Sequence, residues 1–204
     1  VECLAYASRY TLRKKTSQLI FTGKHKLLPK AASILSACTK RIWNEFDSKR
    51  LLKTYGIPTV EEKIVESAFA ATTAAREIRF PVVLKGLVHG QVHKTESGLV
   101  CLNITSVADL KASFADLTRR MKGKGQILLQ QQMPIEYELI VGMVHDEQFG
   151  PCVMFGLGGI FSELQKDVVF APAPLSTSTA KELIRRISGK KLLQGFRGRK
   201  PLDM

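Results

Sequence analysis

A short apolar strand that leads into a single lysine constrains the fold of this chain more than any other stretch. Pro81 to Leu84 reads PVVL, a β-branched apolar run typical of a buried strand, and we expect the strand to end at Lys85. A stretch with three glycines and the pair His93–Lys94 follows, before a second short strand. This arrangement suits an anion, because glycines let backbone N–H groups approach and lysine supplies a point charge. An ordinary hairpin with an extended lysine would give the same pattern.

The distribution of charge argues against a nucleic-acid-binding domain. The 204 residues contain 31 Lys and Arg against 18 Asp and Glu, a formal net charge of +13, and residues 1–50 hold eleven of the bases but three of the acids. Because the basic excess is concentrated in one segment, we expect no nucleic-acid partner. No apolar run approaches the roughly 20 residues of a membrane helix, so we expect no membrane partner. The four cysteines form no C-x-x-C pair, which indicates a reducing, cytoplasmic compartment.

Helix boundaries are indicated by capping residues. Ser67 and Ser106 are expected to cap the starts of two helices, Gly56 to end another, and Thr179 with Glu182 to form a capping box. The predicted helices are 1–16, 31–37, 43–55, 67–78, 106–121 and 179–187.

Strands are indicated by apolar runs and by alternation. Leu139, Val141 and Met143 alternate with small and polar positions in a longer strand at 136–145, and a flexible loop is expected at 156–159. Strands are predicted at 63–65, 81–85, 100–104, 127–132, 136–145 and 152–155, with strand or irregular β structure at 160–170. Strand and helix alternate first, and a run of strands with one helix follows. This order predicts an α/β (α+β) fold of two small lobes with a cleft between them.

Seven stretches resemble, in order and with similar spacing, the ATP-grasp domain of the ADP-forming (NDP-forming) acyl-CoA synthetases, the acetate–CoA ligase family. They are LLKTYGIPT at 51–59, FPVVLK at 80–85, HKTESG at 93–98, LLQQQMP at 128–134, ELIVGMVHDEQFGP at 138–151, FGLGGIFSELQKDV at 155–168, and APL with GFRG at 173–175 and 195–198. The resemblance covers about residues 30–204. It implies an ATP-grasp fold, a nucleotide between the lobes, and ATP or ADP with Mg²⁺ as cofactors.

The same resemblance divides the chain. Residues 1–16 are similar to the end of a preceding CoA-ligase-like domain, and 17–45 to the basic linker that follows it in fused members. A first lobe then spans 46–126 and a second lobe spans 127–204. The basic N-terminal segment also has the composition of an organellar transit peptide, but the resemblance favours a linker. CoA-binding and CoA-ligase domains of the same or a partner chain are the expected partners, and they would bring the acyl-CoA and acid substrates.

The resemblance implies an acid–thiol ligase. The family interconverts an acyl-CoA, ADP and phosphate with the free acid, CoA and ATP through an acyl phosphate and a phosphorylated histidine. His93 resembles that histidine, and a neutral imidazole can attack phosphorus. Lys85 resembles the strand lysine that neutralises nucleotide phosphates, and Lys94 is expected to steady the transferred phosphate. Solvated side chains are the alternative for all three.

The expected adenine and ribose contacts lie on either side of Pro134. Leu129, Gln130, Gln131 and Met133 resemble the segment that meets adenine largely through backbone groups. The family usually has an acid where this chain has Gln131, which leaves an acceptor without its charge. Glu138 resembles a carboxylate that binds ribose or a metal-linked group, and the polar side of an exposed strand is its alternative.

The expected phosphate and metal contacts come from the C-terminal part. Gly158 and Gly159 would allow a phosphate or the CoA-ligase domain to approach closely, and Arg197 would clamp phosphate. Glu163 and Asp167, four residues apart, are the candidate Mg²⁺ ligands. A structural ion pair is the alternative for these two carboxylates.

Two departures from the family pattern indicate an incomplete site. Leu99 stands where the loop usually has a second glycine. The family also continues past the equivalent of 201–203 to an Asn and an Asp that ligate Mg²⁺. Because phosphoryl transfer depends on metal to neutralise charge, we expect the isolated chain to be inactive. Two other functions stay open: a ligand-sensing ATP-grasp-like domain of a protein lysine acetyltransferase, and a non-catalytic interaction module.

Overall fold

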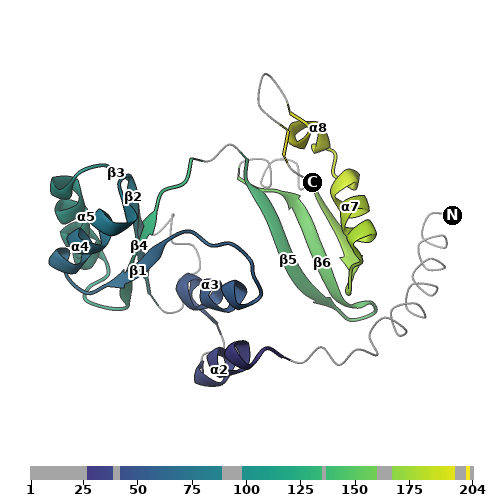
Figure 1. Cartoon of the computed structure of the whole chain (residues 1–204), viewed down its shortest axis with the longest axis horizontal. Helices are drawn as coiled ribbons and strands as arrows, with labels where there is room; N and C mark the ends of the chain where they lie inside the picture. Colours follow the sequence, from purple (N-terminus) through teal and green to yellow (C-terminus); the bar gives the residue numbers. More distant parts are fainter. Residues whose placement is uncertain are drawn as a thin grey trace. The chain divides into compact units, whose positions relative to one another are not determined.

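The computed structural model describes residues 27–38, 42–88, 98–134, 137–159, 167–195 and 201–202. The chain divides into two compact units (Figure 1): an N-terminal unit, Lys24–Pro134, and a C-terminal unit, Ile135–Met204. The helix predicted at 1–16 lies outside the described residues. Among the described helices, none has the length and apolarity needed to cross a membrane.

A four-stranded antiparallel sheet in the order β1-β4-β2-β3 forms the N-terminal unit. Its last strand in the chain, β4, pairs with both β1 and β2, so the lobe boundary expected at 126/127 lies instead at 134/135. The elements are α2 (Pro29–Ala37), α3 (Glu45–Thr54), β1 (Glu62–Val65), α4 (Ala68–Ile78), β2 (Val82–Leu87), β3 (Val100–Ile104), α5 (Val107–Arg120) and β4 (Gln126–Gln131).

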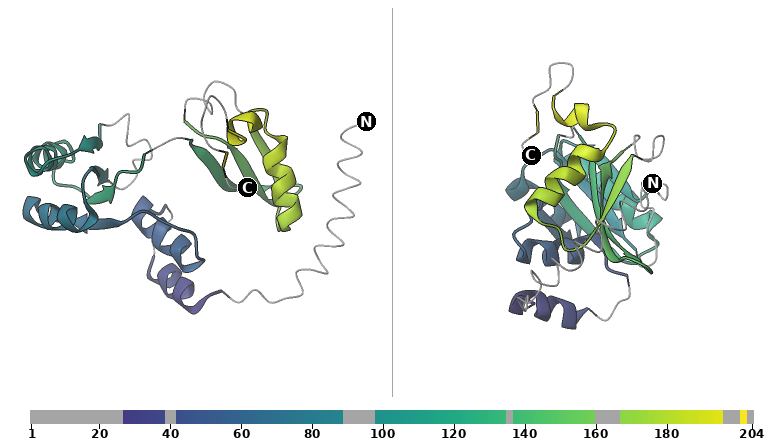
Figure 2. Two further views of the ribbon diagram at one scale, coloured as in Figure 1. Left: turned by 45° about the horizontal axis from the view of Figure 1, so that its top comes forward. Right: turned by 90° about the vertical axis from the view of Figure 1, so that its right-hand side faces the viewer.

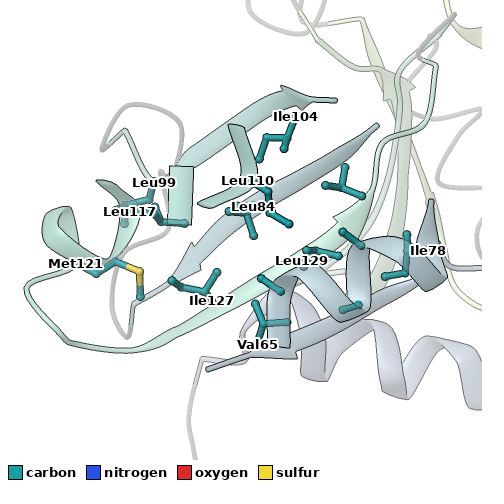
Figure 3. Close-up of a cluster of buried hydrophobic side chains, with 14 residues drawn as sticks. Val65, Ile78, Leu84, Leu99, Ile104, Leu110, Leu117, Met121, Ile127 and Leu129 are labelled. Carbon is teal, nitrogen blue, oxygen red and sulfur yellow. The ribbon is translucent and has the colours of Figure 1, made fainter. Parts of the chain in front are cut away.

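The core of this unit lies between one face of the sheet and the helices α4 and α5 (Figure 3). Leu84 of β2 and Leu129 of β4 are register partners, and both are fully buried in this core. Because successive side chains of a strand point to opposite faces, Lys85 lies on the sheet face away from α4 and α5. The core therefore fixes the side of the sheet from which Lys85 can act.

The predicted caps of this unit are confirmed. The hydroxyl of Ser67 accepts a hydrogen bond from the backbone N–H of Ala70 at 3.1 Å, and Ser106 begins α5 in the same way. Gly56, with φ of 78°, follows α3 in a left-handed conformation. The N–H of Gly56 donates to the Lys53 carbonyl and that of Ile57 to the Leu52 carbonyl, which satisfies two groups at the helix end.

One strand end was predicted too early. β2 does not stop at Lys85, because Gly86 and Leu87 pair with Ile127 and Gln126 of β4. Gly86 lies against the core, where an added Cβ would come within 3.0 Å of the sulfur of Met121. Lys85 therefore lies inside the strand, with a defined side-chain direction.

The C-terminal unit contains a three-stranded antiparallel sheet in the order β5-β6-β7, with α7 lying along one face (Figure 2). Phe155 and Leu157 of β6 pack there against Leu183, Ile187 and Leu193. The elements are β5 (Leu139–Asp146), β6 (Gly150–Leu157), β7 (Val168–Pro172), α7 (Thr177–Arg186) and α8 (Lys190–Leu193).

Boundaries of β6 and α7 differ from the prediction. Gly156 and Leu157, expected in a loop, belong to β6 because they pair with Ile140 and Leu139 of β5. α7 begins at 177 rather than at a capping box on Thr179, since Ser176 accepts the hydrogen bond from the backbone N–H of Thr179 at 3.1 Å. The first difference arises from pairing between distant segments, whereas the cap at Ser176 is a local signal that the prediction missed.

Candidate functional site

Lys85 is a cation in an otherwise apolar part of the sheet. It lies opposite Leu128 of β4, which is fully buried, and two residues from Val83, which is 5% exposed on the same face. Its ammonium donates to Oε1 of Glu45 at 2.7 Å, with 22% and 23% of the two side chains exposed. A charge in such surroundings is costly without a partner, and the Glu45 carboxylate supplies that partner.

Glu45 and Lys49, one turn apart on α3, extend this contact into a chain of ion pairs. The ammonium of Lys49 bridges Oε1 of Glu45 at 2.7 Å and Oε2 of Glu62 on β1 at 2.9 Å. Burial opposes ionisation of Glu45, but the hydrogen bonds from Lys49 and Lys85 outweigh it and lower its pKa to about 2. Burial also opposes the charge of Lys49, yet its two carboxylate partners raise its pKa. These pairs attach α3 to the sheet.

Sequence reasoning missed Glu45, Lys49 and Glu62. The first two form an i, i+4 acid–base pair on a predicted helix, a pattern that usually marks a solvated helix face. Nothing local connects that helix to a lysine 40 residues away. Only the pairing of the strands and the placement of α3 bring the four charges together.

Gln130 supplies a second polar group on the Lys85 face. It is the register partner of Val83 on β2 and of Glu62 on β1. Its Oε1 atom is buried, and no hydrogen-bond donor reaches it from the described part of the chain. An unsatisfied buried acceptor costs about 1–3 kcal/mol, so this oxygen is suited to a donor supplied from outside the chain. Gln130 of β4 and Lys85 of β2 are diagonal neighbours, a relation that places the two Cα atoms about 7–8 Å apart in an antiparallel pair.

The other predicted adenine contacts are arranged differently. The side chain of Leu129 is fully buried in the helix-covered core, and the N–H of Gln131 donates to the Glu61 carbonyl at 2.9 Å. The amide of Gln132 bonds Asn103 of β3, with Nε2 to Oδ1 at 2.6 Å. Met133 follows the strand and is half-exposed. Backbone N–H groups of β4 therefore donate to neighbouring segments, and this continues just past the strand to residue 132, whose N–H donates to the Pro81 carbonyl.

In the C-terminal unit, the structure brings Glu138, Gly158 and Gly159 together. The N–H of Gly158 donates to the Glu138 carbonyl at 2.7 Å. A Cβ on Gly158 would lie 2.9 Å from the Cβ of Glu138, and one on Gly159 would overlap the Glu138 carboxylate. The two glycines therefore leave room for the exposed carboxylate of Glu138, a local reason for glycine that the sequence did not indicate.

Asp167 occupies a corner between β7 and the α7–α8 connection. Its Oδ1 accepts from the N–H of Ser188 at 2.8 Å and its Oδ2 from the N–H of Gly189 at 2.7 Å. Burial raises the pKa of Asp167, but these two backbone donors outweigh it and lower the pKa below its usual value. Within the described segments, no three His, Cys, Asp or Glu side chains cluster as metal ligands. The Mg²⁺ role of Asp167 stays a prediction, beside an observed structural role.

Four predicted site residues, His93, Lys94, Glu163 and Arg197, lie outside the described residues. The residues that flank 89–97 are described. Arg120 donates to the Gly98 carbonyl at 3.3 Å, and Leu99, which stands where the family usually has a glycine, is buried in the core of the N-terminal unit. A Cβ on Gly125 would overlap the Leu87 carbonyl, so the turn after α5 lies against the end of β2.

Comparison with known proteins assigns the chain to a protein family. Residues 35–204 match the ATP-grasp domain. The beta subunit of acetate–CoA ligase (ADP-forming) I from Pyrococcus furiosus is 37% identical over 166 residues, covering 78% of this chain and 72% of the subunit. Acetate–CoA ligase (ADP-forming) II from Archaeoglobus fulgidus is 42% identical over 153 residues, covering 75% of this chain but 23% of that protein. The chain thus spans most of a separate subunit and about a quarter of a longer ligase.

A solved structure extends the similarity to three dimensions. It is the dinucleotide forming acetyl-coenzyme A synthetase 1 of Ca. Korarchaeum cryptofilum in complex with coenzyme A and Mg-AMPPCP, with its phosphohistidine segment pointing towards the nucleotide binding site. The sequence identity is 37% and the TM-score 0.73, over 85% of this chain and 78% of that one. The predicted fold and family are confirmed: the chain belongs to the ATP-grasp domain family, in the group of ADP-forming acetate–CoA ligases.

Proposed function

We propose that this chain is the nucleotide-binding part of an ADP-forming acyl-CoA synthetase, with acetyl-CoA as the substrate class of its relatives. ATP or ADP would bind with its phosphates at Lys85, and the phosphoryl group would pass through His93. The observation that carries the proposal is the partly buried, carboxylate-paired ammonium of Lys85 at 2.7 Å from Glu45. A phosphate offers the same ammonium a stronger anionic partner than one carboxylate.

Gln130 and the segment after it are proposed to orient the base. The buried Oε1 of Gln130, which no donor of the described segments reaches, can accept a hydrogen bond from an exocyclic amino group. Met133 is half-exposed beyond the last paired residue of the strand and offers an apolar contact to a ring. This arrangement favours a purine that carries an amino group over an isolated phosphate.

The described carboxylates fit Mg²⁺ unequally. Glu138 is exposed beside Gly158 and Gly159, so its oxygens are accessible, whereas each oxygen of Asp167 already accepts a backbone N–H. Mg²⁺ in such sites usually takes one or two carboxylates together with substrate phosphates and water. We therefore assign Glu138 as the better of the two described candidates. The bound metal would neutralise charge on the transferred phosphate.

The complete reaction would need more than this chain. CoA-binding and CoA-ligase domains, from the same polypeptide or a partner, would supply the acyl phosphate and thiol chemistry, in a cytoplasmic complex. Lys94 and Arg197 would add phosphate contacts, and Glu163 would be a further metal ligand. The isolated chain is expected to bind nucleotide without turning over acyl-CoA.

Calorimetric titration of the full chain with ADP and Mg²⁺ tests the nucleotide site. Lys85→Met should weaken ADP binding at least about tenfold, since a charge-assisted contact contributes about 1.5–3 kcal/mol. Lys63→Met is the matched control, because Lys63 pairs with Glu77 on the outside of the unit. Equal affinity in the two variants would refute the role of Lys85.

Incubation with ATP labelled on its γ-phosphate tests the relay. Acid-labile label on the wild-type chain that is absent from His93→Ala would support a phosphohistidine. Equal label in both would refute the role of His93. Binding of ADP without any label would favour the ligand-sensing alternative.

A further inference from the structure

A groove between α2 and α3 belongs to no site described above. It has a volume of about 920 Å³ and lies wholly within the N-terminal unit. That volume is in the upper part of the range of about 300–1,000 Å³ typical of small-molecule sites. The groove is therefore large enough for a ligand of nucleotide size.

The groove is lined by more cations than acids. Lys30 comes from α2, Arg50 and Lys53 come from α3, and Asp47 is the one acidic residue of the described lining. Asp47 is already engaged, since its Oδ2 accepts from Asn44 at 2.9 Å and its Oδ1 lies 3.7 Å from Arg50. Within residues 27–38 and 42–88, Lys30 and Lys53 form no ion pair. Two positive charges are thus left over for an anion.

Apolar side chains form the remaining wall. Trp43 and Ile34 line the groove beside the cations, and the guanidinium of Arg50 lies 5.9 Å from the ring centroid of Phe46. Cations beside an indole suit a ligand that carries both a negative charge and a flat ring. Neither inorganic phosphate nor a hydrocarbon would use both parts of the lining.

The geometry of α3 separates this groove from the Lys85 face. Glu45 and Lys49 point to the sheet, where they contact Lys85 and Glu62. With 3.6 residues per turn, Arg50 lies about 140° around the helix from Glu45, whereas Lys53 lies about 80° around, at the edge between the two faces. The helix therefore presents Glu45 and Lys49 to the sheet and Arg50, with Lys53 at the edge, to the groove.

We propose that the groove between α2 and α3 binds a phosphate-bearing ligand with an aromatic ring, of the nucleoside phosphate class, as a second site distinct from Lys85. Lys30, Arg50 and Lys53 contact the phosphates, and Trp43 with Ile34 contacts the ring. The proposal does not depend on the role of Lys85.

Trp43 is the only tryptophan in the 204 residues, so its fluorescence reports directly on the groove. The experiment titrates the full chain carrying Lys85→Met with ADP and, separately, with inorganic pyrophosphate, and calorimetry on the same samples measures affinity. A second variant adds Lys30→Met and Lys53→Met. A charge-matched control adds instead Lys111→Met and Lys181→Met, two exposed helix lysines outside the groove.

The expected result is saturable ADP binding that changes Trp43 fluorescence although Lys85 is absent. Loss of Lys30 and Lys53 should weaken it about fivefold, because each exposed charge contact contributes only modestly to binding. The control should keep the affinity, and pyrophosphate should bind more weakly than ADP. No saturable binding, or equal affinity in the groove variant and its control, would overturn the site. Pyrophosphate binding as tight as ADP would overturn the ring contact.

Discussion

The N-terminal and C-terminal units each hold an ionised carboxylate, but with different donors. Glu45 is ionised by the ammonium groups of Lys49 and Lys85, which come from α3 and from the sheet. Asp167 is ionised by the backbone N–H groups of Ser188 and Gly189. A side-chain cation can exchange one anion for another, whereas a backbone donor has a fixed position. The first arrangement is therefore suited to ligand exchange, and the second to fixing the connection between β7 and α8.

The largest expected effect tests the fixed arrangement in the C-terminal unit. A Cβ on Gly156 would come within 2.6 Å of the Asp167 carbonyl oxygen and 2.7 Å of Val168 Cγ1, so backbone must move. Gly156→Ala should lower the free energy of unfolding by about 1–3 kcal/mol, the usual effect of overpacking. Urea denaturation of the full chain, followed by circular dichroism, measures this change.

Gly142→Ala is the matched control for that change. Gly142 lies on β5 of the same sheet, and its added Cβ would meet only the end of the Met154 side chain at 3.3 Å, which can rotate. We expect a change of less than about 0.5 kcal/mol for it. Equal losses for the two alanines would mean that the corner at Asp167 is not tightly packed.

The next effect is a loss of stability in acid. The pKa of Asp167 is lowered in the folded state, so its contribution is present above the unfolded pKa and is lost as pH falls. Asp167→Asn should therefore reduce the free energy of unfolding at pH 7 by about 1–2 kcal/mol, and this loss should shrink as the pH falls below the unfolded pKa towards the lowered folded pKa. Urea midpoints measured from pH 7 to pH 3 give this dependence. A constant difference across that range would show that geometry, not charge, is responsible.

Substitution of Glu45 should affect ligand binding as well as stability, because its partner Lys85 is also the proposed phosphate ligand. The folded pKa of Glu45 is about 2 against a usual 4.5, so its ion pairs stabilise the fold at neutral pH and are lost between about pH 4.5 and pH 2. At neutral pH, Glu45→Gln removes a negative charge that competes with phosphate for Lys85. We expect ADP affinity to rise about threefold, within the range of an exposed or partly exposed charge pair.

Calorimetry on Glu45→Gln, with Glu62→Gln as control, decides this point. Glu62 pairs with Lys49, and among the described ion pairs none joins it to Lys85, so Glu62→Gln should leave ADP affinity unchanged. Weaker ADP binding by Glu45→Gln would instead assign Glu45 to holding Lys85 in position for the nucleotide.

The same contrast explains what could be predicted from the sequence. The presence of a strand before Lys85 and the caps at Ser67 and Ser106 depend on residues close together in the sequence, and these predictions are confirmed. The pairing of Glu45 with Lys85 joins residues 40 apart, and that of Asp167 with Gly189 joins residues 22 apart. No local pattern marks such pairs. The strand β2 was predicted too short for the same reason, since β4 determines where its pairing ends.

The smallest expected effect compares two positions in one row across the sheet of the C-terminal unit. Val141 of β5, Phe155 of β6 and Val169 of β7 are successive register partners and share one face. Phe155 is 7% exposed and Val169 packs against the core, whereas Val141 is 71% exposed. Val141→Thr should change stability by less than about 0.5 kcal/mol.

Val169→Thr is the matched substitution, and it should cost about 1 kcal/mol because its hydroxyl enters a partly buried apolar contact. Thermal unfolding of both variants at pH 7 makes the comparison. The two substitutions make the same chemical change on the same face of the same sheet. The difference between their losses of stability therefore measures the effect of covering that face with α7. Equal losses would show that the β5 part of this face is also covered in solution, which would extend the apolar core of the C-terminal unit across all three strands.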